Sequence, residues 1–310
     1  MSDDHSDLLP GPAPTRQAEN AADAALDVLI LSRDRACQLD AVLRSARAFL
    51  SLPHRVHVLY TTSNLAFERG YNALRRWYPE VDWVEEGGPF RMALLELLER
   101  IAAGPGRHLM PMVDDQIFTR PFSAHGLVDL LDEDEDVLAV SLRLGENITY
   151  CHPRKIKTTP PDFSNGHRWD WKRANAGYWN YPMSVDANIY RTADIAPYWP
   201  TLPFQKAEVL EAAMSRRPLE RPHLVCEAAP SVLNLAMHRV QSTFQNPAGN
   251  LRPEALNTSF LSGFAMDVRP LIGRTFNSCH VEAEVSLILD ARWQPAGPRP
   301  PASPAWKPTQ

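Results

Sequence analysis

The sequence lacks an excess of basic residues, a long apolar run and any paired cysteine motif. Its net charge is -5 over 310 residues, whereas a protein that binds nucleic acid carries basic charge that neutralises phosphates. No apolar run approaches the roughly 20 residues that a membrane-spanning helix needs. The four cysteines show no C-x-x-C spacing, which argues against a disulfide framework and a thiolate zinc site. We therefore expect no nucleic-acid partner and no membrane span, and the cytoplasm is the default location.

Both ends of the chain lack the pattern of a packed core. Residues 1–25 carry acids where a secretory signal carries basic residues, and they include no apolar segment. Residues 291–310 are rich in proline, which cannot donate a hydrogen bond to a helix or a sheet. We predict a disordered leader over 1–25, one folded domain over 26–290 and a disordered tail.

Strand-like and helical patterns alternate in the first third of this domain. The strand-like segments and the amphipathic helical segments follow one another in the order 27–32, 38–50, 55–63, 71–78, 81–86, 90–102 and 108–115. Because right-handed crossovers place helices on both sides of parallel strands, this order predicts an α/β fold with a mostly parallel central sheet. Ligands of such sheets bind beyond the carboxyl ends of the strands.

Polar clusters follow three of the predicted strands, at Ser32–Arg35, Thr61–Asn64 and Val113–Gln116. Each cluster on its own could be a capped turn, but three of them on one edge favour a site. The carboxylates of Asp114 and Asp115 are costly to bury unless a cation or a hydrogen-bond donor meets them. The chain has no G-x-G-x-x-G after its first strand and no G-x-x-x-x-G-K-[ST]. A phosphate would therefore have to be held by a metal ion and by arginines.

The sequence resembles the nucleotide-sugar-dependent glycosyltransferases of GT-A fold, in particular small bacterial members close to family two. The segments that carry the resemblance are "VLILSRDRACQLDAVLRS", "VDDQIF", "SVDANIYRTADI" and "LNTSFLSGF...NSCHVEAE". The resemblance implies a Rossmann-like nucleotide-binding half over 26–120 and an acceptor half over 121–290. It also implies transfer of a sugar from a nucleoside-diphosphate sugar, with UDP favoured, to an acceptor hydroxyl. The acceptor could be a glycan, a lipid-linked glycan or a small molecule, and inversion is favoured over retention.

The resemblance further implies a divalent cation, Mn²⁺ or Mg²⁺, at the "VDDQ" element. A cation held by carboxylates neutralises the diphosphate as it departs. Adjacent residues of an extended chain point opposite ways, so we expect Asp115 to bind the metal and Asp114 to bind the ribose or a metal-bound water. By resemblance, His280 is the distal metal ligand. The alternative for His280 is a structural role.

Other residues are expected to bind the nucleotide or to activate the acceptor. Asp34 is expected to accept from the base or the ribose, and an arginine suits the phosphates. The predicted nucleotide-binding residues are Ser32, Arg33, Asp34, Arg35, Thr62, Ser63, Arg91 and Asp114. The resemblance places Arg91 near the nucleotide, and the alternative is that Arg91 is a solvent-exposed charge on a helix. The resemblance implies a catalytic base on the helix over 204–214 and favours Glu211, followed by Glu208, which shares its helix face, and by Asp186, which could instead bind the donor sugar.

The segment 162–182 holds five aromatic residues, Trp169, Trp171, Tyr178, Trp179 and Tyr181. Indole and phenol rings are good platforms for sugar rings, so an acceptor loop is one interpretation. The other is that these rings anchor a long connection to the core.

Three other functions remain open from the sequence. A nucleotidyltransferase usually carries a glycine-rich basic loop after its first strand, and "SRDRACQLD" has no glycine. A metal-dependent phosphohydrolase would place its acidic pair after the first strand rather than the fourth. A catalytically silent sugar-binding or scaffold protein of the same fold would keep nucleotide binding without turnover.

Overall fold

The computed structural model describes residues 26–122, 125–164, 166–236, 252–283 and 285–293. The predicted disordered leader lies outside the described residues, as does the predicted tail from residue 294 onward.

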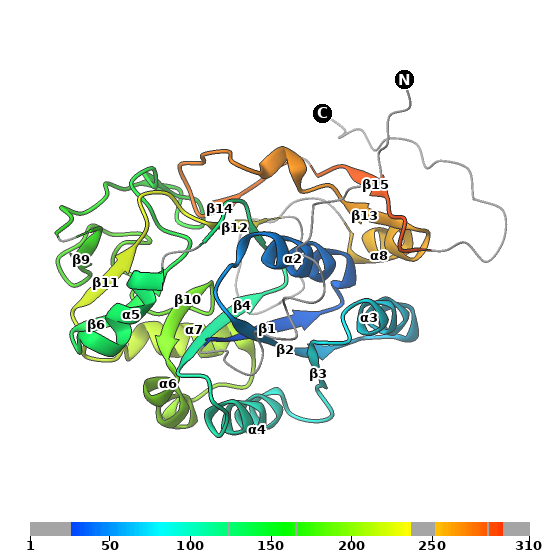
Figure 1. The fold of residues 1–310 in the computed structure, drawn as a ribbon, viewed down its shortest axis with the longest axis horizontal. Coiled ribbons are helices and arrows are strands. Elements are labelled where there is room, and N and C mark those ends of the chain that lie inside the picture. The colour runs from blue at the N-terminus through cyan, green and yellow to red at the C-terminus, as the bar shows by residue number, and fades with distance from the viewer. Residues whose placement is uncertain (1–25, 123–124, 165, 237–251, 284, 294–310) are drawn as a thin grey trace.

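A central sheet of eight strands in the order β3-β2-β1-β4-β10-β6-β11-β9 organises the fold (Figure 1). The strands span β1 Leu26–Arg33, β2 His54–Thr61, β3 Asp82–Glu85, β4 His108–Val113, β6 Val137–Ser141, β9 Arg168–Asp170, β10 Asn188–Arg191 and β11 His223–Cys226. The first four in this order pair in parallel. Strand β10 is antiparallel to both of its neighbours, so β6 runs in the direction of β4. The predicted mostly parallel sheet is confirmed.

Helices cover both faces of this sheet, as the sequence predicted (Figure 1). They span α2 Ala36–Phe49, α3 Leu65–Trp77, α4 Phe90–Ala102, α5 His125–Glu133, α6 Thr192–Tyr198, α7 Ala207–Arg216 and α8 Pro253–Leu261, with 3-10 turns η1 Trp199–Thr201 and η2 Arg269–Leu271. Along β1, Val28 and Ile30 pack with α2, α3 and α8, whereas Leu29 and Leu31 pack with α4 and α7. The period of two along the strand therefore builds two hydrophobic cores.

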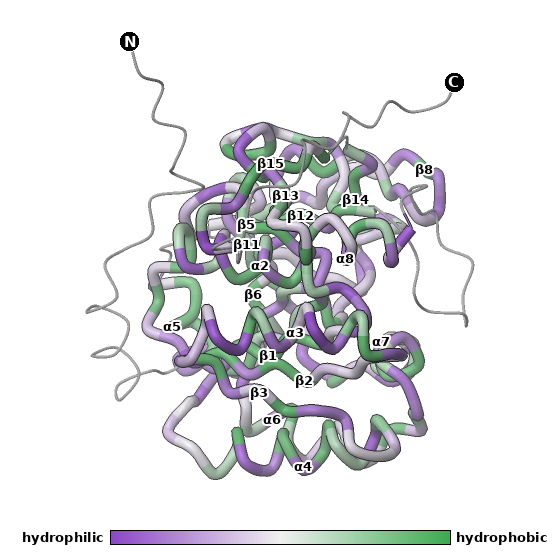
Figure 2. Tube along the Cα trace, turned by 90° about the vertical axis from the view of Figure 1, so that its right-hand side faces the viewer, coloured by the Kyte–Doolittle hydropathy of each residue, from purple (hydrophilic) through white to green (hydrophobic). Residues whose placement is uncertain are grey.

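The helices alternate polar and apolar residues along their length, which is visible for α4 in Figure 2. The buried residues of α4 are Leu94, Leu97, Leu98 and Ile101, at the spacing of one helical face. None of the helices in the described ranges is both long and apolar enough to cross a membrane.

A small second sheet, in the order β14-β12-β5, connects the end of β4 with the C-terminal part of the chain. Its strands are β5 Gln116–Phe118, β12 Val232–Leu235 and β14 His280–Val281. Asn234 of β12 pairs with Gln116 on one side and with His280 on the other. The turn Asp114–Asp115 joins β4 to β5, so this sheet carries the predicted distal histidine toward the predicted acidic pair. Two short antiparallel pairs complete the strands, β7 Tyr150–Cys151 with β8 Ile156–Lys157 and β13 Phe264–Met266 with β15 Leu287–Leu289.

Ordered structure continues beyond the predicted end of the domain at residue 290. The guanidinium of Arg292 lies 2.8 Å from the carboxylate of Asp40 in α2, and the same carboxylate accepts from Arg44 at 2.8 Å. Trp293 packs edge-on against Trp77 and Phe260. Proline-rich composition did not reveal this boundary, because Arg292 and Trp293 are fixed by partners far away in the sequence.

We predict that Asp40→Ala lowers the free energy of unfolding by about 3 kcal/mol, because it leaves Arg44 and Arg292 without their shared, fully buried carboxylate (0% exposed). Urea denaturation measures this change. The control is Glu80→Ala, which removes the partner of Arg47 in a surface ion pair and should cost less than about 1 kcal/mol. Equal changes in the two variants would contradict the account of the buried cluster.

Candidate active site

The Asp114 carboxylate brings the ends of β1 and β4 together. One oxygen accepts from the Ser32 hydroxyl at 2.8 Å and from the backbone N–H of Arg33 at 3.0 Å. The other accepts from Arg35 Nη1 at 2.8 Å. Both oxygens of this buried group are therefore used by the protein. Ser32 also shares a hydrogen bond with the hydroxyl of Tyr71 at 2.5 Å.

Asp34 joins the ends of β1 and β2. Its side chain accepts from the backbone N–H of Ser63 at 2.7 Å, and its own N–H donates to Thr61 at 3.3 Å. The residue adopts φ 55°, a left-handed conformation that aspartate tolerates better than most residues. The three polar clusters thus meet at one edge of the sheet. Thr62 is half-buried at this edge, and the Arg33 side chain is 59% exposed above it.

Asp115 differs from Asp114 in its access to solvent. Its side chain is 22% exposed against 4% for Asp114, and it accepts from Arg35 Nη1 at 2.9 Å. Burial raises the pKa of Asp115 to about 6, and the neighbouring carboxylates of Asp114 and Asp186 add to this against the opposing charge of Arg35. Of the pair, Asp115 is the carboxylate that a ligand can reach.

A second acidic centre comes from the other half of the chain. Asp186, in the turn before β10, accepts from the buried Arg143 at 3.2 Å. Burial raises the pKa of Glu211 on α7 to about 7, the charge of Asp186 adds to this rise, and Arg143 opposes it. The hydroxyl of Tyr181 hydrogen-bonds to Glu211. Two of the predicted catalytic residues, Asp186 and Glu211, therefore lie together.

His280 lies beside this second centre. Its Nδ1 is 2.9 Å from the hydroxyl of Tyr178, and the two rings stack with centroids 5.7 Å apart. Its Nε2 is 3.8 Å from the Asp186 carboxylate. Burial lowers the pKa of His280 to about 4, although Asp186 opposes the shift. The imidazole is therefore neutral at pH 7, which is the form that binds metals.

The predicted metal ligands are unequal in what they offer a cation. Within the described part of the chain, no three His, Cys, Asp or Glu side chains gather closely enough to hold a metal ion by themselves. Both carboxylate oxygens of Asp114 accept hydrogen bonds from the protein. The side chains of Asp115 and His280 are instead 22% and 25% exposed to solvent. A carboxylate and a neutral imidazole fit Mn²⁺, and Mg²⁺ is usually bound by one or two carboxylates with substrate phosphates. The donor set thus fits a cation that the substrate helps to hold.

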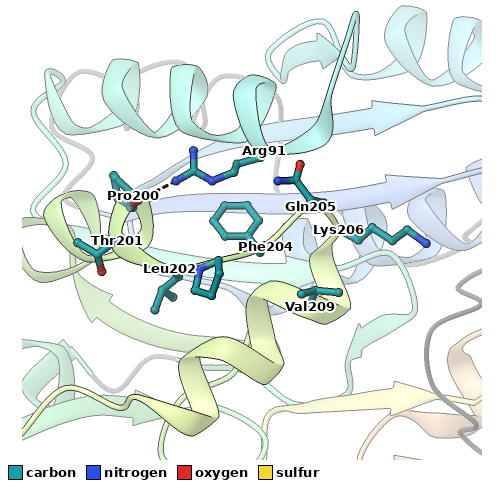
Figure 3. Close-up of a pocket in the computed structure, with 9 residues that line it drawn as sticks. Arg91, Pro200, Thr201, Leu202, Phe204, Gln205, Lys206 and Val209 are labelled. Atoms are coloured by element: carbon teal, nitrogen blue, oxygen red, sulfur yellow. Dashed lines mark hydrogen bonds between the residues drawn. The ribbon is translucent and has the colours of Figure 1, made fainter.

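One predicted residue has its contacts elsewhere. Arg91, near the start of α4, donates to the carbonyl of Pro200 at 2.7 Å and stands over the ring of Phe204. Together they line a cavity of about 640 Å³ between α4 and the start of α7 (Figure 3). The described contacts of Arg91 do not include the polar strand ends, so they do not support its predicted nucleotide role. Glu208 is half-buried in the first turn of α7, one turn before Glu211.

Most aromatic residues of the segment 162–182 serve packing. Trp169 and Trp179 are buried, and their ring N–H groups donate to backbone carbonyls at 3.0 and 3.1 Å. The ring N–H of Trp171 donates to the carbonyl of Arg221. Tyr178 and Tyr181 instead contact His280 and Glu211. The anchoring interpretation is therefore correct for the tryptophans, and the two tyrosines belong to the site.

Arg143 is a residue of this site that no sequence pattern indicated. This residue follows the apolar run "DVLAVS", whose last five residues form β6. Because β6 runs in the direction of β4, its carboxyl end lies at the same edge of the sheet as the acidic turn. Strands β4 and β5, and strands β6 to β10, follow one another without a helix between them. The sequence therefore indicates the strand before Arg143 but not the edge of the sheet at which that strand ends.

The sequence is similar to that of a known glycosyltransferase. It is 27% identical over 187 residues to the bifunctional glycosyltransferase pgtA of Dictyostelium discoideum, a match that covers 54% of this chain and 24% of that protein. The chain thus spans about a quarter of the length of this curated relative. No family model matches the sequence. The relative confirms the resemblance to glycosyltransferases that the motifs indicated.

Solved structures show a partial likeness. The structure of S. aureus TarS 1–349 in complex with UDP-GlcNAc is 12% identical, with a TM-score of 0.44 and coverage of 76% of this chain and 65% of that one. GalNAc-T7 with UDP, GalNAc and Mn²⁺ is 11% identical, with a TM-score of 0.46 and coverage of 77% and 48%. At such low identity and overlap, the likeness carries no inference about residues, substrate or metal.

We predict that Arg35→Met lowers the free energy of unfolding at pH 7 by about 3 kcal/mol, because it leaves two neighbouring carboxylates without their cation. The matched control is Arg33→Met, since the Arg33 side chain is mostly exposed and its loss should change stability by about 0.5 kcal/mol or less. Urea denaturation of both variants compares them. A loss for Arg35→Met as small as that of the control would contradict the role of Arg35.

Proposed function

We propose that this chain is a glycosyltransferase that moves a sugar from a nucleoside-diphosphate sugar to an acceptor hydroxyl with inversion. The observation that supports it best is the pair of acidic centres, Asp114–Asp115 from one half of the chain and Asp186 with Glu211 from the other. Sugar transfer needs both a place for a departing diphosphate and a base for an incoming hydroxyl. The sequence similarity to a glycosyltransferase supports the same reaction.

The nucleotide is assigned to the edge formed by the ends of β1, β2 and β4. Asp34 is fixed there by the backbone of Ser63, and Arg33 is exposed above it. The fork of donors in an arginine matches phosphate oxygens. Arg33 is therefore the cation that we assign to the diphosphate, while Arg35 is engaged with the acidic pair. A UDP-sugar is the favoured donor.

A divalent cation, Mn²⁺ or Mg²⁺, is assigned to Asp115 with His280. When bound, such a cation neutralises charge on the leaving diphosphate. Asp115 is the accessible carboxylate of its pair, and His280 is neutral and oriented by Tyr178. A hydrogen bond to the second ring nitrogen is the usual way in which proteins orient a metal-binding histidine.

Glu211 is assigned as the base. A general base works best when its pKa lies near the working pH, and burial places the pKa of Glu211 at about 7. The carboxylate takes the proton of the acceptor hydroxyl as the hydroxyl attacks the sugar carbon and the carbon–oxygen bond to the diphosphate breaks. Tyr181 holds Glu211 by a hydrogen bond, and Asp186 is assigned to the hydroxyls of the donor sugar.

A second candidate is a catalytically silent protein that binds nucleotide sugars. The observation in its favour is that Arg35 already neutralises Asp115 at 2.9 Å, which leaves less charge for a metal ion. Binding of a nucleotide sugar, with or without metal, without consumption of any donor would support it.

The variant Asp115→Ala tests the metal assignment. For the wild type, Mn²⁺ with the cognate nucleoside diphosphate at about 100 times its dissociation constant should raise the melting temperature by roughly 5 to 10 °C. We expect the variant to lose this metal-dependent shift across a panel of UDP, GDP, CMP and dTDP. Asp129→Ala, an exposed change on α5, should keep it. An unchanged shift in Asp115→Ala would show that the metal binds elsewhere.

The variant Glu211→Gln tests the base. It keeps the size of the side chain but cannot accept a proton, so transfer should fall by about 100-fold or more while the thermal shift with the donor is retained. Glu99→Gln, an exposed glutamate on α4, is the matched control and should transfer sugar at the wild-type rate. Full activity of Glu211→Gln would move the base to another residue.

A further inference from the structure

Arg143 is a buried cation at the second acidic centre. Its side chain is 2% exposed, and its Nη1 lies 3.2 Å from the carboxylate of Asp186, which is also buried. The guanidinium stands 5.5 Å from the centroid of the Tyr178 ring, the ring that stacks on His280. The backbone carbonyl of Arg143 accepts from the Cys279 thiol at 3.1 Å. Arg143 therefore contacts both sides of the site, the turn before β10 and the segment that carries His280.

The energetic balance of this arginine does not suit a purely stabilising role. Moving a guanidinium and a carboxylate out of water costs several kcal/mol per ion, and their attraction repays this only with good geometry and further hydrogen bonds. Within the described residues, Asp186 is the one ion-pair partner of Arg143, and the buried Nε has no hydrogen-bond partner. An apolar side chain would fill this place at lower cost. The pair is better explained by what it does to the site.

Arg143 supplies the positive charge on the side of the site where three carboxylates face one another. Asp186 interacts electrostatically with both Asp115 and Glu211. Arg35 offsets the charge of the Asp114–Asp115 pair, whereas Arg143 faces Asp186 and Glu211. Each acidic centre thus has its own arginine.

We propose that Arg143 is a positioning residue that fixes the Asp186 carboxylate and offsets the charge of Asp186 beside Glu211, so that Glu211 is ionised when the acceptor arrives. The inference rests on the proposed function, because it concerns the base of that reaction. Arg143 does not touch the reacting atoms and acts through its two acidic neighbours.

The pH dependence of kcat/KM tests this role. The groups that interact with Glu211 are Asp186, Arg143, the hydroxyls of Tyr181 and Tyr190, and the backbone of Val185. Removal of the cation favours the protonated carboxylic acid, so Arg143→Gln should shift the acid limb of the profile to higher pH. We expect a shift of about one pH unit, seen as an approximately tenfold loss of kcat/KM on the acid side that is recovered at higher pH. Arg143→Lys keeps the charge and should keep the acid limb near its wild-type position.

The control is Arg44→Gln, which removes another buried arginine from an ion pair with an aspartate, far from the site. It should lower stability while leaving the acid limb in place. An unshifted acid limb in Arg143→Gln, with sugar transfer retained by the wild type, would overturn the inference and leave the proposed function standing. Absence of transfer by the wild type with every donor would instead count against the proposed function.

A second measurement needs no activity. Urea denaturation of Arg143→Gln, Asp186→Asn and the double variant should show non-additive losses, because the first change removes the partner that the second would lose. Strictly additive losses would show that Arg143 does not hold Asp186 and would overturn the inference, whether or not the wild type transfers sugar. Should Arg143→Gln fail to fold, Arg143→Met, which removes the cation and leaves no polar group to bury, gives the same comparison with Asp186→Asn.

Discussion

The arrangement of the candidate site depends first on Arg35, because one nitrogen of its guanidinium contacts both carboxylates of the acidic turn. Arg35 Nη1 lies 2.8 Å from Asp114 and 2.9 Å from Asp115, at a turn where two adjacent acids would otherwise repel each other in a buried place. Asp114 then uses its remaining acceptor capacity on Ser32 and on the backbone of Arg33. The ends of β1 and β4 are joined by these contacts, and Asp34 joins β2 to them. Charge compensation therefore builds the edge of the sheet to which the nucleotide is assigned.

A buried arginine also compensates the charge of the second acidic centre, where Arg143 interacts with Asp186 and Glu211. Of the first pair, Asp115 is the accessible member, and Glu211 is half-buried on α7. In each centre a more deeply buried carboxylate, Asp114 or Asp186, contacts the arginine and lies beside the more accessible one. A folded scaffold that compensates most of its buried charge can keep one carboxylate ready for a metal ion and another ready for a proton.

The sequence predicted local features well and long-range pairing poorly. Hydrophobic periodicity located β1, β2, β4 and α2, because a buried strand and an amphipathic helix each have a period that sequence alone displays. The expectation that Asp114 and Asp115 point opposite ways is not met, because the two residues occupy a turn and both carboxylates accept from Arg35 Nη1. Arg143 was missed because its relation to Asp186 depends on the antiparallel strand β10, which no local pattern specifies.

Arg91 was expected at the nucleotide, but its partner is the carbonyl of Pro200, which only the folded chain brings near. The tryptophans of the segment 162–182 were ambiguous for the same reason, since Trp171 and Trp179 are held by the carbonyls of Arg221 and Ile148, which lie outside the segment.

The central claim is that the bond broken is the one between the sugar carbon and the diphosphate. Phosphorus NMR of UDP-, GDP-, CMP- and dTDP-sugars incubated with the wild-type protein, Mn²⁺ and a mixture of glycan acceptors follows that bond directly. The account predicts that one donor, a diphosphate sugar, is consumed and that its intact nucleoside diphosphate is released, in the presence of metal only. Release of a nucleoside monophosphate with a sugar phosphate would show cleavage within the diphosphate, and would contradict a glycosyltransferase in favour of a phosphohydrolase or a nucleotidyltransferase.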